Sequence, residues 1–225
     1  QQGPSGTRRM HIGVSDEVER SFVVEVVSLF LRKQRLDRRP KITIVAGTQS
    51  QLIERLKFRE LDIIITELAM KDPDLMNLSR TETPVVLVCA KNRKKKPMLG
   101  KKKIISAISN AIGNEITQWA MPSTKFKLRT EIDQFFEKNE LKGHVVLESD
   151  VIASLVRSVV DDIGLGLFPL LYVAKEIKEQ SLRILGPKQG YWKYRVWLAC
   201  RPQSHEDSVI KEFAKSFEEV GNTSH

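Results

Sequence analysis

Hydrophobic and polar residues alternate most clearly between Lys41 and Glu67. An alternating apolar run ends at Gly47, apolar residues recur at helical spacing from Leu52 to Leu56, and an unbroken apolar run covers Leu61 to Ile65. These patterns are typical of a half-buried strand, an amphipathic helix and a strand covered on both faces. The segment therefore predicts a β-α-β unit with parallel strands and a right-handed crossover.

A similar strand-to-helix turn precedes this unit. Arg9 to Val14 predicts a short strand, and Ser15 and Asp16 are suited to accept hydrogen bonds from the first amides of a helix. Apolar residues then repeat on one face of a helix that we expect to run from Phe22 to Leu36. Pro40 closes the connection, so the order β-α-β-α-β is complete by Glu67.

The remaining pattern predicts a second α/β lobe and a return to the first. Leu68 to Thr83 is interpreted as a loop, the apolar run after Pro84 as a strand, and Lys91 to Lys103 as a surface connection into the second lobe. The further elements expected are helices at 104–112, 126–136, 151–159, 170–177 and 207–220, and strands at 116–121, 144–147, 165–168 and 191–201.

The expected fold class is therefore α/β, with two Rossmann-like lobes joined by two crossovers near residues 85–91 and 190–196. Lobe I comprises residues 9–90 and 191–220, and lobe II comprises residues 91–190. Residues 1–8 are interpreted as linker or expression residues and 221–225 as a frayed tail.

Two of these segments resemble a known family. The strand, helix and short Leu-Asp-apolar strand of residues 41–67, and the helix followed by Gly-Leu-Gly-Leu-Phe-Pro in residues 149–169, are similar to the effector-binding domain of LysR-type transcriptional regulators. The resemblance covers most of residues 9–220 and implies a type 2 periplasmic-binding-protein-like fold. The run from Met121 to Leu141 looks most like the sodium/proton antiporter regulator branch.

Hydroxyl residues recur where predicted strands lead into helices, and helix amino ends attract small polar or anionic ligands. Each hydroxyl could equally be a simple helix cap. The resemblance implies that such turns line a cleft between the lobes, and positional matching gives the effector-binding candidates Ser15, Thr48, Thr66, Ser123, Thr124, Asp150 and Phe168.

Three carboxylates depart from the usual pattern around that cleft. Asp16, Glu67 and Asp150 would disfavour the carboxylate effectors common in the family, although Lys125 and Lys127 could offset them. An acidic surrounding is compatible with a cation, and the antiporter-regulator branch is linked to sodium and alkaline response. Ordinary surface carboxylates would give the same sequence.

Composition changes this picture little. The net charge of +9 comes largely from residues 32–41 and 91–103, which lack interleaved aromatic residues for stacking on bases, so we interpret them as solvated loops and helix ends. No apolar run reaches the roughly eighteen residues of a membrane span. Cys89 and Cys200 lie in apolar strand-like runs without metal spacing, which favours free thiols in a reducing cytoplasm.

No catalytic constellation emerges, and neither an enzyme nor a cofactor is expected. The four histidines have no paired metal spacing, Asp161 and Asp162 point in different directions on a helix, and Gly164-Leu-Gly166 lacks the spacing of a phosphate-binding loop. The glycines are better suited to the close packing of a strand.

Two functions remain. The first is a regulatory domain that binds a small-molecule or ion effector and acts on DNA only through an N-terminal winged helix-turn-helix absent from this chain, as the resemblance implies. The same resemblance implies a homodimer or tetramer formed through Phe22–Leu36 and Lys41–Ala46. The alternative is a free-standing solute-binding protein of a transporter with the same fold.

Overall fold

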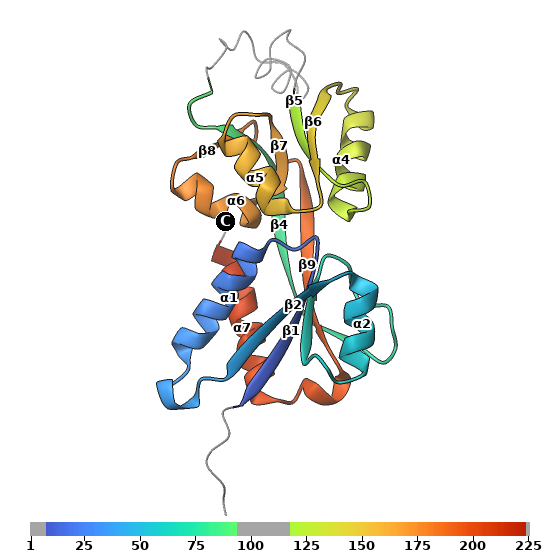
Figure 1. Cartoon of the computed structure of the whole chain (residues 1–225), viewed down its shortest axis with the longest axis vertical. Helices are drawn as coiled ribbons and strands as arrows, with labels where there is room; N and C mark the ends of the chain where they lie inside the picture. The colour runs from blue at the N-terminus through green and yellow to red at the C-terminus, as the bar shows by residue number, and fades with distance from the viewer. Residues whose placement is uncertain (1–7, 94–117, 224–225) are drawn as a thin grey trace, which may run out of the picture. The chain divides into compact units, whose positions relative to one another are not determined.

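The structure is a computed structural model that describes residues 8–93 and 118–223. The chain forms two compact units, with residues 1–82 and 195–225 in unit 1 and residues 83–194 in unit 2. It passes between them twice, inside β4 (Met76–Ala90) and inside β9 (Trp192–Cys200) (Figure 1). The predicted fold class, two α/β lobes joined by two crossovers, is confirmed.

Unit 1 contains a sheet with the strand order β2-β1-β3-β9-β4. β1 (Arg9–Ser15) runs parallel to both β2 (Lys41–Gly47) and β3 (Ile63–Thr66), whereas β9 pairs antiparallel with β3. The predicted parallel β-α-β unit is therefore confirmed, with β1 placed between its two strands. As a result the carboxyl ends of β1, β2 and β3 meet at one edge of the sheet.

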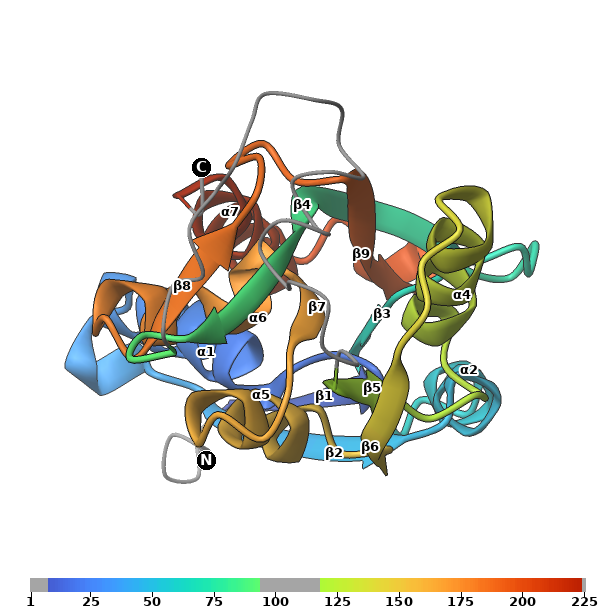
Figure 2. The ribbon, with the colours of Figure 1, turned by 90° about the horizontal axis from the view of Figure 1, so that it is seen from above.

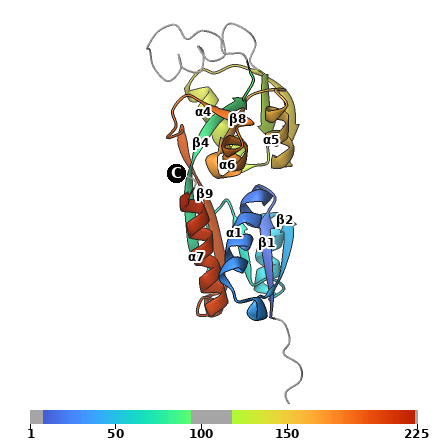
Figure 3. The same ribbon diagram turned by 90° about the vertical axis from the view of Figure 1, so that its left-hand side faces the viewer.

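Helices cover both faces of this sheet. α2 (Gln49–Lys57) buries Leu52 against Gly13 of β1, where an added Cβ would lie 2.9 Å from the leucine side chain. On the other face, α1 (Arg20–Lys33) and α7 (Ser208–Thr223) lie side by side (Figure 3). Edge-to-face ring pairs join these two helices, which makes them one packed layer over the sheet.

Unit 2 has two small groups of strands. β5 (Gln118–Pro122) and β6 (His144–Ser149) form a parallel pair, and β7 (Gly166–Pro169) and β8 (Leu182–Leu185) pair antiparallel with the second half of β4. α4 (Lys127–Lys138) and α5 (Ile152–Val160) flank the β5–β6 pair, and α6 (Leu170–Lys178) packs beside β7 and β8 (Figure 2). The Trp119–Leu165 bridge links the two groups.

Several predicted elements need correction. β4 begins at Met76, inside the segment predicted as a loop. The first half of this strand is polar and therefore lacks a strand-like pattern, but it lies beside β9 in the sheet. Arg195 pairs with Glu82 at 2.8 Å, and Arg80 lies 5.6 Å from the centroid of the Trp197 ring. The sequence does not predict strand β8, because its short apolar run is interrupted by Arg183 and only Leu182 of its four residues is buried.

The first helix also differs at both ends. It begins at Arg20 and is capped by Glu19, whose carboxylate accepts from the amide of Ser21, because Ser15 to Val18 forms a separate turn. It ends at Lys33 rather than Leu36, since Gln34 adopts an extended backbone, and a 3-10 turn covers Leu36–Arg38. The predicted helix at 104–112 and most of the 91–103 connection lie outside the described residues.

Candidate functional site

The strand ends of unit 1 bring three of the predicted residues together. Register pairs Ser15 with Gly47, the residue before Thr48, and the amide of Asp16 donates to the Gly47 carbonyl at 3.1 Å. Val14 pairs with Ile65, which sets Thr66 level with Ser15 at the end of the neighbouring strand. We call this set, Ser15, Thr48 and Thr66, the polar edge of unit 1.

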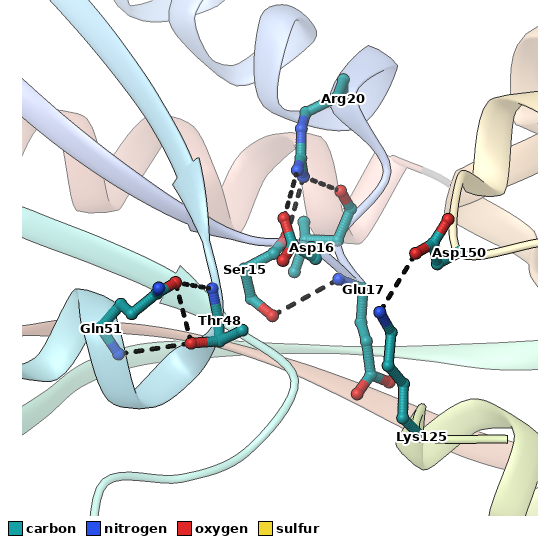
Figure 4. Close-up of polar contacts among 9 residues, drawn as sticks. Ser15, Asp16, Glu17, Arg20, Thr48, Gln51, Lys125 and Asp150 are labelled. Carbon is teal, nitrogen blue, oxygen red and sulfur yellow. Dashed lines mark hydrogen bonds and ion pairs between the residues drawn. The ribbon is translucent and has the colours of Figure 1, made fainter. Parts of the chain in front are cut away.

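Thr48 caps α2 as predicted (Figure 4). Its hydroxyl accepts from the amide of Gln51, and the Gln51 side chain accepts from the amide of Thr48 at 3.1 Å, which completes a capping box. The spacing of Thr48 and Gln51 was the sequence signal for this arrangement. Because Thr48 is exposed at a helix amino end, it can meet a polar ligand directly.

The other two hydroxyls are buried and shape the backbone. Ser15 accepts from the amide of Glu17 at 3.4 Å, and Thr66 donates to the carbonyl of Leu68 at 2.6 Å. Arg20 reinforces the first turn by donating to the carbonyl of Ser15 at 2.7 Å (Figure 4). Ser15 therefore does not cap α1, in contrast to the prediction, and holds the turn that precedes it.

Carboxylates also surround this edge. Asp16 lies 3.5 Å from the guanidinium of Arg20, Glu19 is used as the cap of α1, and Glu67 is buried at the end of β3. Part of the negative charge predicted from the sequence is therefore engaged in local structure. Asp16 remains partly exposed at the edge.

In unit 2, three more predicted residues meet at the carboxyl ends of β5 and β6. Ser123 and Thr124 follow β5, Asp150 follows β6, and the amide of Ser123 donates to the carbonyl of Ser149 at 2.9 Å. We call Ser123, Thr124 and Asp150 the polar edge of unit 2. Neither hydroxyl caps α4, because Phe126 occupies the cap position without a side-chain bond.

Lys125 offsets one carboxylate, as the sequence suggested. Its ammonium lies 3.1 Å from Asp150, and this hydrogen bond lowers the pKa of the aspartate (Figure 4). A carboxyl group with a lowered folded pKa stabilises the fold above its ordinary pKa, and that contribution is lost as the pH falls through the folded value. The contribution of the pair is therefore present at neutral pH and is lost in acid.

Phe168 lies apart from these groups. Its side chain is fully buried, and a Cβ added at Gly166 would lie 2.2 Å from its ring. A Cβ at Gly164 would lie 3.0 Å from the carbonyl of Gln118. The predicted role of these glycines in close strand packing is confirmed, and Phe168 supports the core of unit 2.

Arg129 is a supporting residue that the sequence did not indicate. Its guanidinium donates to the carbonyl of Pro122 at 2.9 Å, to Asp133 at 2.9 Å and to Glu148 at 3.0 Å. Burial acts to lower the pKa of Arg129, but the bonds to the two carboxylates raise it on balance. Arg129 thus fixes the residue before Ser123. Its pair with Asp133 is a local i,i+4 contact, whereas the bonds to Pro122 and Glu148 depend on how α4 packs against β5 and β6.

Within residues 8–93 and 118–223, no three His, Cys, Asp or Glu side chains gather as metal ligands would. Cys89 and Cys200 are free and buried. Burial raises the pKa of Cys89 and raises that of Cys200 to about 11, so both remain protonated at neutral pH.

A comparison with protein-family models matches the LysR substrate binding domain over residues 1–222. The chain belongs to the LysR substrate-binding domain family. Its two α/β units accordingly form a periplasmic-binding-protein-like fold, and the predicted relationship to effector-binding domains of LysR-type transcriptional regulators is confirmed.

Solved LysR structures share this fold. The chain is similar to the apo regulatory domain of HypT from Salmonella typhimurium, with a TM-score of 0.68, 13% identity and coverage of 97% of this chain and 98% of that one. For the Synechocystis CcmR regulatory domain in complex with 2-PG, the TM-score is 0.66 and the identity 16%, with coverage of 95% of this chain and 97% of that one. For Vibrio fischeri DarR in complex with DNA, the TM-score is 0.71 and the identity 13%, with coverage of 93% of this chain and 68% of that one.

A search of curated proteins found no match. None of the helices in the described part of the chain is long and apolar enough to cross a membrane.

Proposed function

We propose that this LysR domain binds a small-molecule or ion effector in a cleft lined by the polar edges of its two units. The observation that carries the proposal is that each unit gathers polar residues at the carboxyl ends of its parallel strands. In open α/β sheets, ligands bind outside this end of the strands. The 2-PG complex of CcmR is a ligand-bound relative of the same fold, which favours the same kind of role here.

The proposal extends to the output of the domain. Effector binding would control a winged helix-turn-helix on the N-terminal side of this domain, and that segment would read the operator in the cytoplasm. DarR supports the link to DNA, because this chain covers 68% of that protein and the DarR structure is a complex with DNA. Family membership favours this role over a free-standing solute-binding protein.

Sodium is one of two effector classes that the charges support. Asp16 and Asp150 are partly exposed carboxylates next to the two edges, paired with Arg20 and Lys125, and a cation would share them with these partners. Lys125 neutralises Asp150, which makes the edge of unit 2 acceptable to a small carboxylate as well. The closeness to the antiporter-regulator branch, a sequence resemblance, favours the cation.

A thermal-shift screen of the chain against sodium salts, matched potassium salts and small carboxylates tests the proposal. An effector at a hundred times its dissociation constant is expected to stabilise the chain by about 2.7 kcal/mol. Asp150→Asn should weaken the shift if the effector is sodium and strengthen it if the effector is a carboxylate, because the substitution removes one negative charge.

Asp161→Asn is the matched control, since Asp161 also pairs with one exposed cation, Arg157 at 2.8 Å, but lies at the far end of α5. The control should leave the effector-induced shift unchanged. If no member of either class shifts the transition, or if the control changes the shift as much as Asp150→Asn, the proposed site is wrong.

We further propose that the domain self-associates through α1 and β2, to a dimer or tetramer. β2 is the last strand in its sheet order, and both elements expose aliphatic side chains, with Val24 54% and Ile44 40% exposed. A neighbouring chain would remove this apolar surface from water.

Ile44→Asp is expected to shift the chain toward monomers in light scattering at high concentration, because it puts a charge into the apolar contact. Val145→Asp on β6 is the control, as Val145 is a β-branched strand residue with a similar exposure of 38%. A native chain that is monomeric at high concentration would exclude the contact.

A further inference from the structure

A basic surface lies at the opposite end of the unit 1 sheet from its polar edge. Register pairs Arg9 at the start of β1 with Lys41 at the start of β2, and Arg38 and Arg39 lie in the connection just before β2. All four side chains are exposed. We call Arg9, Arg38, Arg39 and Lys41 the basic edge.

The charges of the basic edge lack a carboxylate partner in the part of the chain that the structure describes. Among the described residues, none of its four side chains makes an ion pair or a side-chain hydrogen bond. Adjacent cations do pair, since Arg8 binds Asp207 and Arg35 lies 3.2 Å from Asp37. The sheet register and one short turn thus hold four positive charges close together, and none of the four is paired with a carboxylate of the described residues.

A groove continues the basic edge along α1 and α7. It has a volume of about 360 Å³ and is lined by three further cations, Lys33, Arg35 and Lys215, together with Arg38 and the carboxylate of Glu212. Phe30 contributes to its lining but is itself fully buried. Lys33 pairs with Glu219 and Arg35 with Asp37, so Lys215, beside the carboxylate of Glu212, is the cation that the groove adds to the basic edge. The residues that line the groove offer no exposed aromatic ring on which a base could stack.

A polyanion fits these features better than a single small anion. Clustered like charges repel one another, and a chain of phosphates relieves that repulsion at several points while releasing its own counterions. Guanidinium groups also match phosphate geometry with two parallel hydrogen bonds. The four side chains of the basic edge are arginines and a lysine, without an aromatic ring among them, so such contacts would be to the DNA backbone and independent of sequence.

We propose that the basic edge binds the sugar-phosphate backbone of duplex DNA beside the site read by the DNA-binding segment. This rests on the proposed function, under which that segment joins the chain ahead of Arg9, at the end of the sheet where the basic edge lies. The domain would then increase the affinity of the regulator for DNA through electrostatic contacts, without adding to its sequence specificity.

The test measures binding of the 225-residue chain to a fluorescent duplex of arbitrary sequence as salt is raised from about 50 to 200 mM. Each phosphate contact contributes about −0.9 to the slope of log affinity against log salt. The triple variant Arg9→Gln, Arg38→Gln and Arg39→Gln should therefore flatten the slope by about 2.7 and weaken binding at low salt. Lys41 is left intact because it belongs to the proposed self-association strand.

The matched control is Lys94→Gln, Lys95→Gln and Lys96→Gln, which removes the same charge from the other basic run of the sequence. This control should keep most of the native slope. The proposal is overturned if the native chain shows no salt-dependent DNA binding, or if the control flattens the slope as much as the basic-edge variant. Effector binding is read by thermal shift without DNA, so failure here leaves the effector proposal separately testable.

Discussion

Phe213→Ala is expected to lower the free energy of unfolding by about 3–5 kcal/mol, the usual cost of removing a fully buried aromatic side chain. Phe213 is fully buried on α7, and its ring lies 5.5 Å from that of Phe30 on α1 in an edge-to-face pair. The substitution leaves a cavity between two helices that together cover one face of the unit 1 sheet. Urea denaturation monitored by circular dichroism measures the loss as a lower midpoint at an unchanged slope.

Phe58→Ala provides the comparison for this result. Phe58 follows α2 and is 76% exposed, so truncation should change the free energy of unfolding by no more than about 0.5 kcal/mol. Similar losses for the two variants would mean that α1 and α7 do not form the packed layer described here.

Arg129→Met is expected to cost about 2 kcal/mol of stability, because the side chain of Arg129 is only 13% exposed and each hydrogen bond to a charged group stabilises by roughly 1.5–3 kcal/mol. The half-exposed carboxylates of Asp133 and Glu148 are rehydrated when the guanidinium is lost, which keeps the cost below the sum of its bonds. The carbonyl of Pro122 loses its donor, so the turn carrying Ser123 should loosen as well. Effector affinity is therefore expected to fall together with stability.

Arg157→Met separates this effect from loss of charge alone. Arg157 is 74% exposed and, among the described residues, pairs with Asp161 four residues later, so its removal should leave the denaturation midpoint close to that of the native chain. Chemical denaturation and effector titration of both variants decide the matter. Equal effects would indicate that Arg129 contributes only a surface charge.

Local patterns in the sequence predicted the parts of the fold that depend on nearby residues. The β-α-β unit follows from apolar spacing, and the Thr48 cap from a hydroxyl residue between a strand and a helix, and both are present. The sequence predicts the second half of β4 as a strand but its first half as a loop, because that half reads as polar and its pairing with β9 is not visible in the sequence. Pairing between segments that are distant in the sequence produces no local hydrophobic pattern from which a strand could be predicted.

The candidate site shows the same division. The predicted ends of the strands were enough to bring Ser15, Thr48 and Thr66 together, since the carboxyl ends of parallel strands share one edge of the sheet. The side-chain roles depended on packing instead: Thr66 and Phe168 are fully buried, and Glu19 rather than Ser15 caps α1. The role of Arg129 could not be predicted, because only its pair with Asp133 is local, and its bonds to Pro122 and Glu148 require the packing of α4 on β5 and β6.

The central claim is that the polar edges of the two units bind one effector together. The most direct measurement is an amide-resolved NMR titration of the chain with whichever salt or carboxylate raises its melting temperature. The account predicts that the amides of Ser15, Thr48, Ser123 and Asp150 shift along the same binding curve, with one dissociation constant. Shifts confined to one unit, or two edges with unrelated affinities, would contradict it.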